Sequence, residues 1–428
     1  MAQSRSSASL FRAVIFLATV WTVATCIFLI DNNLFSQRER FQESDFIMTF
    51  YVAGHLAATG RATELYPPPD ARSFIDTPFD RAAHALLPHL PKSSTGAYMY
   101  IPLVAGFFAP FSFVGPNLSL FFWQVLSVTA LALCALLLSG IDSVKTSDLF
   151  FLSFLYGPIF LTLWAGQLGL GFGLAPLCLG YFLLLRQWPL AAGVVWSFLL
   201  LKPQYFVVAA FVALACALTK RNRTLAGLFL GVAGLVVLTI SLFSFSVTSQ
   251  WLQSHRVSDA YFFAGLQGIP SHLITGLPAN LMVLFPVDER AAVKLPLYAG
   301  AAALWLFGLW FCCRHDMLRL AESEQISVMF VVGLVLASLT LPHLLYYDLC
   351  VLWPAGALLM VHDGPLPQQK GLREIGVTGW IVVSAFLPLL LGFANQKALP
   401  LILELILLTL FIGLLIRLNH ALKSAAHV

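Results

Sequence analysis

The sequence predicts an all-α protein that crosses a membrane about twelve times, and three observations predict it. The 428 residues are 59% hydrophobic and only 10% charged, whereas soluble domains are near half apolar and a quarter charged. Apolar runs recur along the chain, several of them about as long as the roughly 20 residues that a spanning helix needs. Basic residues recur at every second connection between these runs. We therefore expect a single membrane domain over residues 1–428, in contact with membrane lipids.

The first expected span, residues 12–30, follows Arg5 and Arg12. It is longer than the apolar core of a secretion signal and no small-residue cleavage site follows it, so we expect it to be retained. The shortest of the later spans fall below about 17 residues and should be tilted, broken or partly re-entrant. These later spans are expected at 117–139, 148–164, 167–185, 188–201, 203–218, 224–245, 293–313, 325–342, 344–361, 375–394 and 398–416.

Basic residues in the short connections set the expected orientation, because cytoplasmic loops carry an excess of lysine and arginine. Those at every second connection are Arg186, Lys220, Arg221, Arg223, Arg314, Arg319, Lys370, Arg373, Arg417 and Lys423. Assigning them to the cytoplasm places both termini inside. The two long polar stretches, 31–97 and 246–292, then become external loops.

The first external loop contains an expected amphipathic helix. Ser44 can cap a helix that runs over residues 45–59, with Phe46, Ile47 and Phe50 on one face. A helix of this kind would lie flat on the outer membrane surface as an interfacial helix.

Residues 98–114 are apolar enough to span, yet a full crossing there would invert the orientation of everything that follows. Pro102, Pro110 and Pro116 interrupt the segment. We therefore expect a dip or an interfacial hairpin, and irregular backbone at that depth must be covered by protein or line a cavity. Such a segment is a candidate wall of a site.

Composition and motifs exclude several classes of function. The net charge of +4 gives no sign of a nucleic-acid partner. The seven cysteines form no CxxC pair and read as small buried apolar residues. The sequence lacks a P-loop, a GxGxxG fingerprint and a GxSxG elbow. The sequence therefore shows no motif for nucleotide chemistry on the cytoplasmic side.

Polar residues within apolar surroundings are costly, so each is a candidate functional residue. Lys202 lies between two apolar runs and directly precedes Pro203. It either snorkels to the outer headgroups or faces an anionic group such as a lipid phosphate. Gln167 lies among glycines in WAGQLGLGFG. It either forms an interhelical hydrogen bond or belongs to a site.

Two further candidates lie on the same expected face. His343 and Asp348, in LPHLLYYDL, could form a hydrogen-bonded pair or bond only local backbone. Asp45 either stabilises the start of the surface helix or acts as a general base at the water–lipid boundary. The expected topology places Asp45, Gln167, Lys202 and His343 together at the outer side, although they are scattered along the sequence.

Five segments, in this order, resemble glycosyltransferase family 87 of the GT-C superfamily of membrane glycosyltransferases. They are SDFIMTFYVAGHLAATGRATELYPP, YMYIPLVAGFFAPFSF, GQLGLGFGLAPL, PLAAGVVWSFLLLKPQYFVVA and LPHLLYYDLCVLWPA. Together with the first span, which precedes them as in the family, they extend over most of the chain from about residue 10 to 360. The sequence departs from the family in YMYIP, where a Tyr-Pro-Pro run is frequent, and in a long insert at 70–97.

The resemblance implies a GT-C-like helical bundle and an inverting transfer of a sugar, with mannose the family's best-attested one. The donor would be a polyprenyl-phosphate-linked sugar and the acceptor a glycolipid or glycan, at the outer face of a bacterial inner (plasma) membrane. By position, Asp45 would be the general base and His343 would assist at the phosphate or the acceptor. Lys202 would neutralise the leaving phosphate. The other substrate-binding residues carried over are Gln167, Tyr51, Tyr100 and Tyr346. We expect no cofactor and no metal.

Two other classes of function remain open at this point. A lipid or sugar transporter or flippase would suit broken helices and an intramembrane lysine, although no inverted repeat is visible. A polysaccharide polymerase or ligase would rely on arginine and histidine of the second external loop, here His255, Arg256 and His272. A glycosyltransferase-like scaffold without activity is a third reading.

Overall fold

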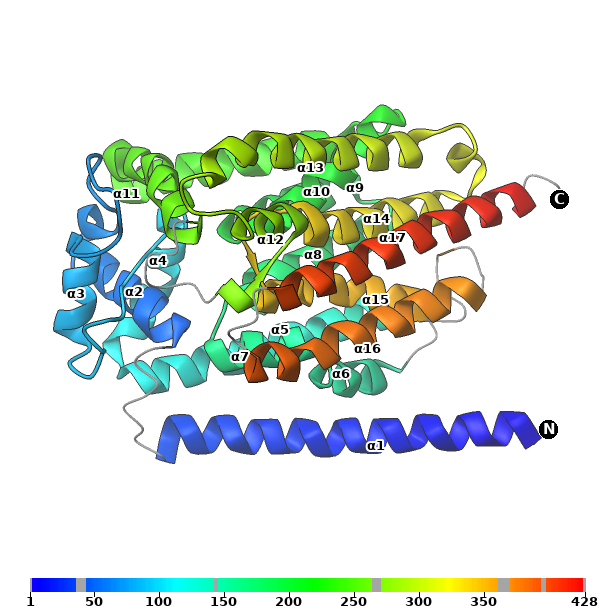
Figure 1. Cartoon of the computed structure of the whole chain (residues 1–428), viewed down its shortest axis with the longest axis horizontal. Helices are drawn as coiled ribbons and strands as arrows, with labels where there is room; N and C mark the ends of the chain where they lie inside the picture. Colours follow the sequence, from blue (N-terminus) through cyan, green and yellow to red (C-terminus); the bar gives the residue numbers. More distant parts are fainter. Residues whose placement is uncertain are drawn as a thin grey trace.

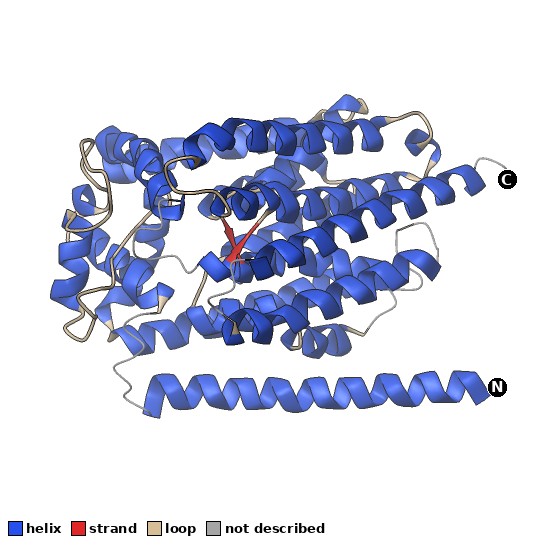
Figure 2. Ribbon diagram, viewed as in Figure 1, coloured by secondary structure: helices blue, strands red, loops and turns tan. Residues whose placement is uncertain are grey.

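Helices make up nearly all of the computed structural model of the chain (Figure 2). The structure describes residues 2–35, 44–141, 145–263, 271–360, 366, 370–393 and 398–425. Within these ranges there is one sheet, of two short antiparallel strands, β1 (Ile274–Thr275) and β2 (Leu344–Leu345). Ile274 is paired with Leu345 and Thr275 with Leu344. The expectation of an all-α protein is confirmed.

Seven helices of the described chain are long and apolar enough to cross a membrane. They are α1 (Ala2–Ile30), α5 (Pro116–Ser139), α11 (Arg223–Phe263), α13 (Arg290–Cys313), α14 (Glu322–Thr340), α16 (Lys370–Gly392) and α17 (Ala398–Ala425). In the apolar window of α14, 83% of the residues are buried, against 17% in that of α13. Therefore α14 forms the centre of the bundle, whereas α13 turns most of its apolar surface outward. The chain is a multi-pass membrane protein.

Six further apolar helices of the bundle are shorter than a membrane span. They are α6 (Thr146–Phe154), α7 (Gly157–Ala165), α8 (Ala175–Leu185), α9 (Pro189–Ser197), α10 (Pro203–Leu218) and α15 (Trp353–Met360). A proline lies in the first turn of α7, α8, α9 and α10, where its missing N–H costs nothing. The axes of α6 and α7 differ by 72°. The short spans are therefore broken as expected, and the count of twelve stays a prediction.

Short helices close one end of the bundle, opposite both termini. Figure 1 shows α2 (Val52–Ala58), α3 (Pro78–Leu86) and α4 (Pro102–Phe108) at the left, with both chain ends at the right. Residues 98–114 form α4 and a 3₁₀ turn at Ala109–Phe113, both packed against α2. This segment is thus a short broken helix at the end of the bundle.

The expected surface helix exists, but its apolar face is turned into the protein. A π-helical stretch, Phe46–Tyr51, leads directly into α2, and the Ser44 hydroxyl accepts a hydrogen bond from the Ile47 N–H at 3.3 Å. Phe46, Ile47 and Phe50 are fully buried. The ring of Phe46 lies 5.4 Å from that of Phe108 in α4. Protein therefore covers the face that was expected to rest on lipid.

The two expected external loops contain regular structure. The first, 31–97, includes α3, and its residues 36–43 lie outside the described part of the chain. The second, 246–292, continues α11 through a kink at Ser244 (φ 71°) and includes α12 (Leu277–Val283). Residues 264–270 of this loop likewise lie outside the described ranges.

Basic side chains tie the helix ends together near the termini. The Arg314 guanidinium, after α13, donates to the Asn419 side-chain oxygen in α17 at 2.7 Å. The guanidinium of Arg221, before α11, donates to the Gln325 side-chain oxygen in α14 at 2.6 Å. These basic connections thus meet at one end of the bundle.

Candidate active site

Asp45 and Gln167 form the first of two polar pairs in the site. The Gln167 side-chain nitrogen donates to Asp45 Oδ2 at 2.7 Å, across 122 positions of sequence. Gly166 makes this approach possible: its φ of +67° is left-handed, and a Cβ there would come within 2.5 Å of the Phe46 Cβ. The Gln167 carbonyl accepts from the Trp123 indole at 3.3 Å, which fixes the loop after α7.

Lys202 and Asp348 form the second pair, and both are almost completely buried. The Lys202 ammonium lies 2.7 Å from Asp348 Oδ1, and the two side chains are 1% and 2% exposed. Lys202 occupies a non-helical position (φ −135°, ψ 77°) between the 3₁₀ turn Phe198–Leu201 and α10, because Pro203 starts a new helix. Asp348 lies in the 3₁₀ turn Tyr346–Leu352, and its Oδ2 accepts from the Leu345 N–H at 3.0 Å.

Two aromatic rings flank the lysine. The ammonium lies 5.4 Å from the ring centre of Tyr347 and 5.8 Å from that of Tyr100, distances at which a cation is attracted to a ring face. The Tyr100 carbonyl accepts from the Tyr66 hydroxyl at 2.6 Å, so the segment before α4 is fixed at this point. Tyr100 is partly exposed while Lys202 is buried, which places the tyrosine at the edge of the cluster.

Electrostatics join the two pairs into one cluster. Burial is the largest influence on the pKa of Asp45 and raises it above the ordinary value. The hydrogen bond from Gln167, the positive charge of Lys202 and a hydrogen bond from Tyr347 each lower this pKa, while the charge of Asp348 raises it. Asp45 therefore responds to both members of the buried ion pair. A carboxyl group whose pKa is raised is a stronger base than an ordinary aspartate, which suits a group that takes up a proton.

The structure brings together four of the residues singled out in the sequence: Asp45, Gln167, Lys202 and Tyr100. His343 lies in the turn just before β2 and is partly exposed. Tyr51 ends the π-helical stretch and is buried among the aromatic side chains around α2 and α4.

Tyr346 points away from this cluster. Its hydroxyl donates to the carbonyl of Val383 in α16, and the side chain packs against Gly157 of α7. The neighbouring Tyr347 faces Lys202 instead. The signal for an aromatic residue here was the pair Tyr346–Tyr347, and only the 3₁₀ geometry decides which member faces the lysine.

Asp348 was recognised as a possible partner of His343, and its contact with Lys202 was missed. The sequence signal was a carboxylate in an apolar segment, which calls for a buried counter-charge. In the second of the two stretches expected to be external loops, His255 and Arg256 are exposed on α11 and His272 is partly buried in a 3₁₀ turn. Across the described ranges, no three or more His, Cys, Asp and Glu side chains are grouped so that they could hold a metal ion.

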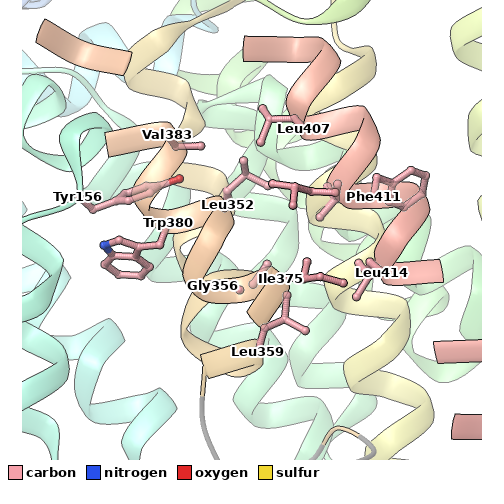
Figure 3. A pocket seen from close by; sticks show the side chains of 15 residues that line it. Tyr156, Leu352, Gly356, Leu359, Ile375, Trp380, Val383, Leu407, Phe411 and Leu414 are labelled. Carbon is pink, nitrogen blue, oxygen red and sulfur yellow. The ribbon is translucent and has the colours of Figure 1, made fainter. Parts of the chain in front are cut away.

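An apolar cavity of about 60 Å³ lies among α14, α15, α16 and α17, inside the spans (Figure 3). Leu352, Trp380 and Phe411 contribute to its lining. Tyr156 is its one phenol, and the Tyr156 hydroxyl donates to the Leu349 carbonyl at 3.1 Å. Because Leu349 follows Asp348, one wall of this cavity belongs to the segment that carries the buried ion pair.

Comparison with known proteins identifies the family. The model of glycosyltransferase family 87 matches residues 98–342, which is more than half of the chain. No curated relative and no solved structure matches the chain. The matched segment includes Tyr100, Gln167 and Lys202, and it ends one residue before His343. The chain therefore belongs to glycosyltransferase family 87 and is a glycosyltransferase.

Proposed function

We propose that the protein transfers a sugar, with mannose as the first candidate, from a polyprenyl-phosphate-linked donor to a glycolipid or glycan acceptor. The reaction takes place at the outer face of a bacterial plasma membrane, with both termini in the cytoplasm and with inversion at the anomeric carbon. The observation that supports this most is a partly buried carboxyl group, Asp45, held by Gln167 beside the buried Lys202–Asp348 pair.

In the proposed mechanism Asp45 is the general base. It takes the proton of the acceptor hydroxyl while that oxygen attacks the anomeric carbon of the donor. The bond from the anomeric carbon to the phosphate oxygen breaks, and its electron pair stays on the phosphate. Asp45 ends protonated, the new glycosidic bond is formed, and a polyprenyl phosphate leaves.

Lys202 stabilises the charge that grows on the leaving phosphate. An ammonium has three N–H donors, and Asp348 needs only one of them at 2.7 Å. Asp348 thus orients the lysine while further donors remain for the phosphate. In a site with little water such a charge is worth far more than in solution, which is why preorganised cations dominate steps of this type.

Gln167 has two roles in this proposal. Its side-chain nitrogen orients Asp45, whereas its Oε1 is buried and has no hydrogen-bond partner among the described residues. A buried acceptor without a partner costs about 1–3 kcal/mol. A sugar hydroxyl that donates to Oε1 would remove this cost, so the amide would hold the base and a substrate hydroxyl in one geometry.

The prenyl chain of the donor would occupy the apolar cavity beside α15. Leu352 ends the 3₁₀ turn that carries Asp348, and α15 then runs along the cavity. The proposed phosphate site at Lys202 and the cavity therefore share one element, the turn Tyr346–Leu352. The cavity lies in the membrane spans, where only hydrocarbon is available as solvent.

The test is a transfer assay with purified protein in nanodiscs, a radiolabelled polyprenyl-phosphate-mannose and a membrane glycolipid extract. We expect label in a new lipid or glycan with the wild type and none with Asp45→Ala. If both proteins transfer the label, His343 or Asp348 becomes the candidate for the general base. If both proteins bind the donor and neither transfers label, the sugar or the acceptor used in the assay is not the right one. Loss of transfer on Arg256→Ala and His272→Ala, with Asp45→Ala active, would favour a polymerase or ligase.

A further inference from the structure

Glu404 is a carboxyl group inside a membrane span that the proposed mechanism does not use. It lies in α17, six residues after the helix begins at Ala398, which is about 9 Å along the axis. The side chain is fully buried. Ionisable groups at such depth are costly and are usually retained for a function, with a specific partner.

The partner of Glu404 is a backbone group of the second external loop. Its Oε1 accepts a hydrogen bond from the Gly276 N–H at 2.8 Å. Gly276 has a φ of +93°, and a Cβ there would lie 2.2 Å from the Leu341 carbonyl oxygen, so only glycine fits. The loop therefore approaches α17 at a position that tolerates no side chain.

A continuous path of contacts leads from this hydrogen bond to the proposed site. Gly276 directly follows β1, and β1 pairs with β2 in the one sheet of the described chain (Figure 2). At the end of β2 the Leu345 N–H donates to Asp348 Oδ2 at 3.0 Å. The other oxygen of Asp348 lies 2.7 Å from the Lys202 ammonium.

We propose that Glu404 is a positioning residue for the buried ion pair. By holding Gly276, it fixes β1 against α17. The sheet then fixes β2, and β2 fixes the carboxylate that orients Lys202. A two-residue ladder is too short to be stable alone, so an anchor on a rigid helix is required at this point.

The inference rests on the proposed role of Lys202 and Asp348, so its test includes a readout that needs no substrate. Hydrogen–deuterium exchange is measured on the full-length protein in nanodiscs, over peptides that cover 271–284 and 344–352. Three variants are compared with the wild type: Glu404→Gln, which keeps an acceptor oxygen of the same reach, Glu404→Asp, which shortens the reach, and Glu404→Met, which removes the acceptor.

We expect Glu404→Met and Glu404→Asp to raise exchange about tenfold in both peptides, the effect of losing one buried hydrogen bond. Glu404→Gln should exchange like the wild type. Thr409→Met is the matched control on the same helix, because its exposed hydroxyl donates to the Leu405 carbonyl of α17 itself. If Glu404→Met does not fold, the difference in exchange between Glu404→Asp and Glu404→Gln still tests the proposal.

Exchange that rises only in 271–284 would overturn the proposal, since the loop would then loosen without moving the strand next to Asp348. So would equal exchange in all variants. Transfer activity adds a second test: Glu404→Met should lower kcat about tenfold, but have little further effect in an Asp348→Asn background. Fully additive losses would contradict action through Asp348. Absence of transfer by the wild type would refute the proposed donor and leave the exchange result standing.

Discussion

Gln167 donates its amide hydrogen to Asp45 across 2.7 Å, and this bond joins the loop after α7 to the start of the π-helical stretch before α2. The same amide presents a buried Oε1 that no described residue satisfies. One side chain can thus orient the base and receive a substrate hydroxyl. This relationship makes Asp45 the first residue to test.

Asp45→Asn should lower kcat by about 10²–10⁴-fold, the range expected for loss of a general base. The asparagine oxygen can still accept from Gln167, so the fold and the binding of donor should be retained. Initial rates of transfer in nanodiscs measure the effect, with thermal unfolding as the check on folding. Near wild-type activity in a folded sample would show that Asp45 is not the base.

The pH profile should report the environment of Asp45. Burial raises its pKa, and the base works only when ionised, so kcat/KM should fall as the pH drops through this raised value. The neighbours predict opposite shifts of the acidic limb. Lys202→Met removes a charge that lowers the pKa and should move the limb to higher pH, whereas Asp348→Asn removes a charge that raises it and should move the limb to lower pH.

Residual activity in both variants is enough for this comparison, because only the position of the limb matters. Shifts in the same direction for the two variants would contradict the electrostatic coupling of Asp45 to the pair. The raised pKa of Asp45 also makes the free energy of unfolding depend on pH. The stabilisation from binding this proton is fully present below the pKa of Asp45 in the unfolded chain, and it is lost as the pH rises through the pKa in the folded protein.

Much of the helical architecture could be predicted from the sequence, because its causes are local. Prolines at helix starts produce the short broken spans, and the breaks at Gly166 and Pro203 place Gln167 and Lys202 at helix ends. The helix after Ser44 was also predictable. What this helix packs against was not predictable, because an apolar face of Phe46, Ile47 and Phe50 can be buried in lipid as well as in protein.

The pairing within the site depends on contacts between distant segments. Asp348 could be recognised as a buried charge, but whether it meets His343 or Lys202 is decided by how the 3₁₀ turn packs against α10. The same turn decides that Tyr347, and not Tyr346, faces the lysine. Glu404 shows in the sequence as a carboxyl group within an apolar run, but its partner does not, because that partner is a backbone N–H in a loop.

Replacing one member of the buried ion pair should destabilise the protein more than replacing both. Lys202→Met leaves the Asp348 carboxylate buried without its counter-charge, which costs about 3–5 kcal/mol. The double variant Lys202→Met/Asp348→Asn removes both charges and keeps an acceptor for the Leu345 N–H. The melting temperature in detergent should therefore be higher for the double variant than for Lys202→Met.

Activity separates the two roles of this pair. The double variant should regain stability but not transfer, since no cation remains beside the leaving phosphate. Recovery of transfer together with stability would show that the pair is purely structural. Instability equal to the sum of the single variants would contradict their mutual compensation.

Filling the apolar cavity should weaken binding of the donor only through its prenyl chain. Gly379 lines the cavity, and a Cβ there would meet the Leu410 side chain at 3.7 Å, an ordinary van der Waals distance, so Gly379→Leu adds its side chain at the cavity wall. We expect the KM for a long-chain polyprenyl-phosphate-mannose to rise about tenfold, the loss of roughly two buried methylene contacts. The KM for a donor with two isoprene units should not change.

The matched control is Gly392→Leu, the same substitution in the same helix, where a Cβ would meet nothing within 4 Å. Gly379 lies inside α16 and Gly392 is its last residue, and neither has a positive φ, so neither change forces a side chain into a left-handed backbone. A rise in KM for the long donor with Gly379→Leu alone would locate the prenyl chain in the cavity. Equal effects of the two variants, or equal effects on the short and long donors, would show that the chain lies elsewhere.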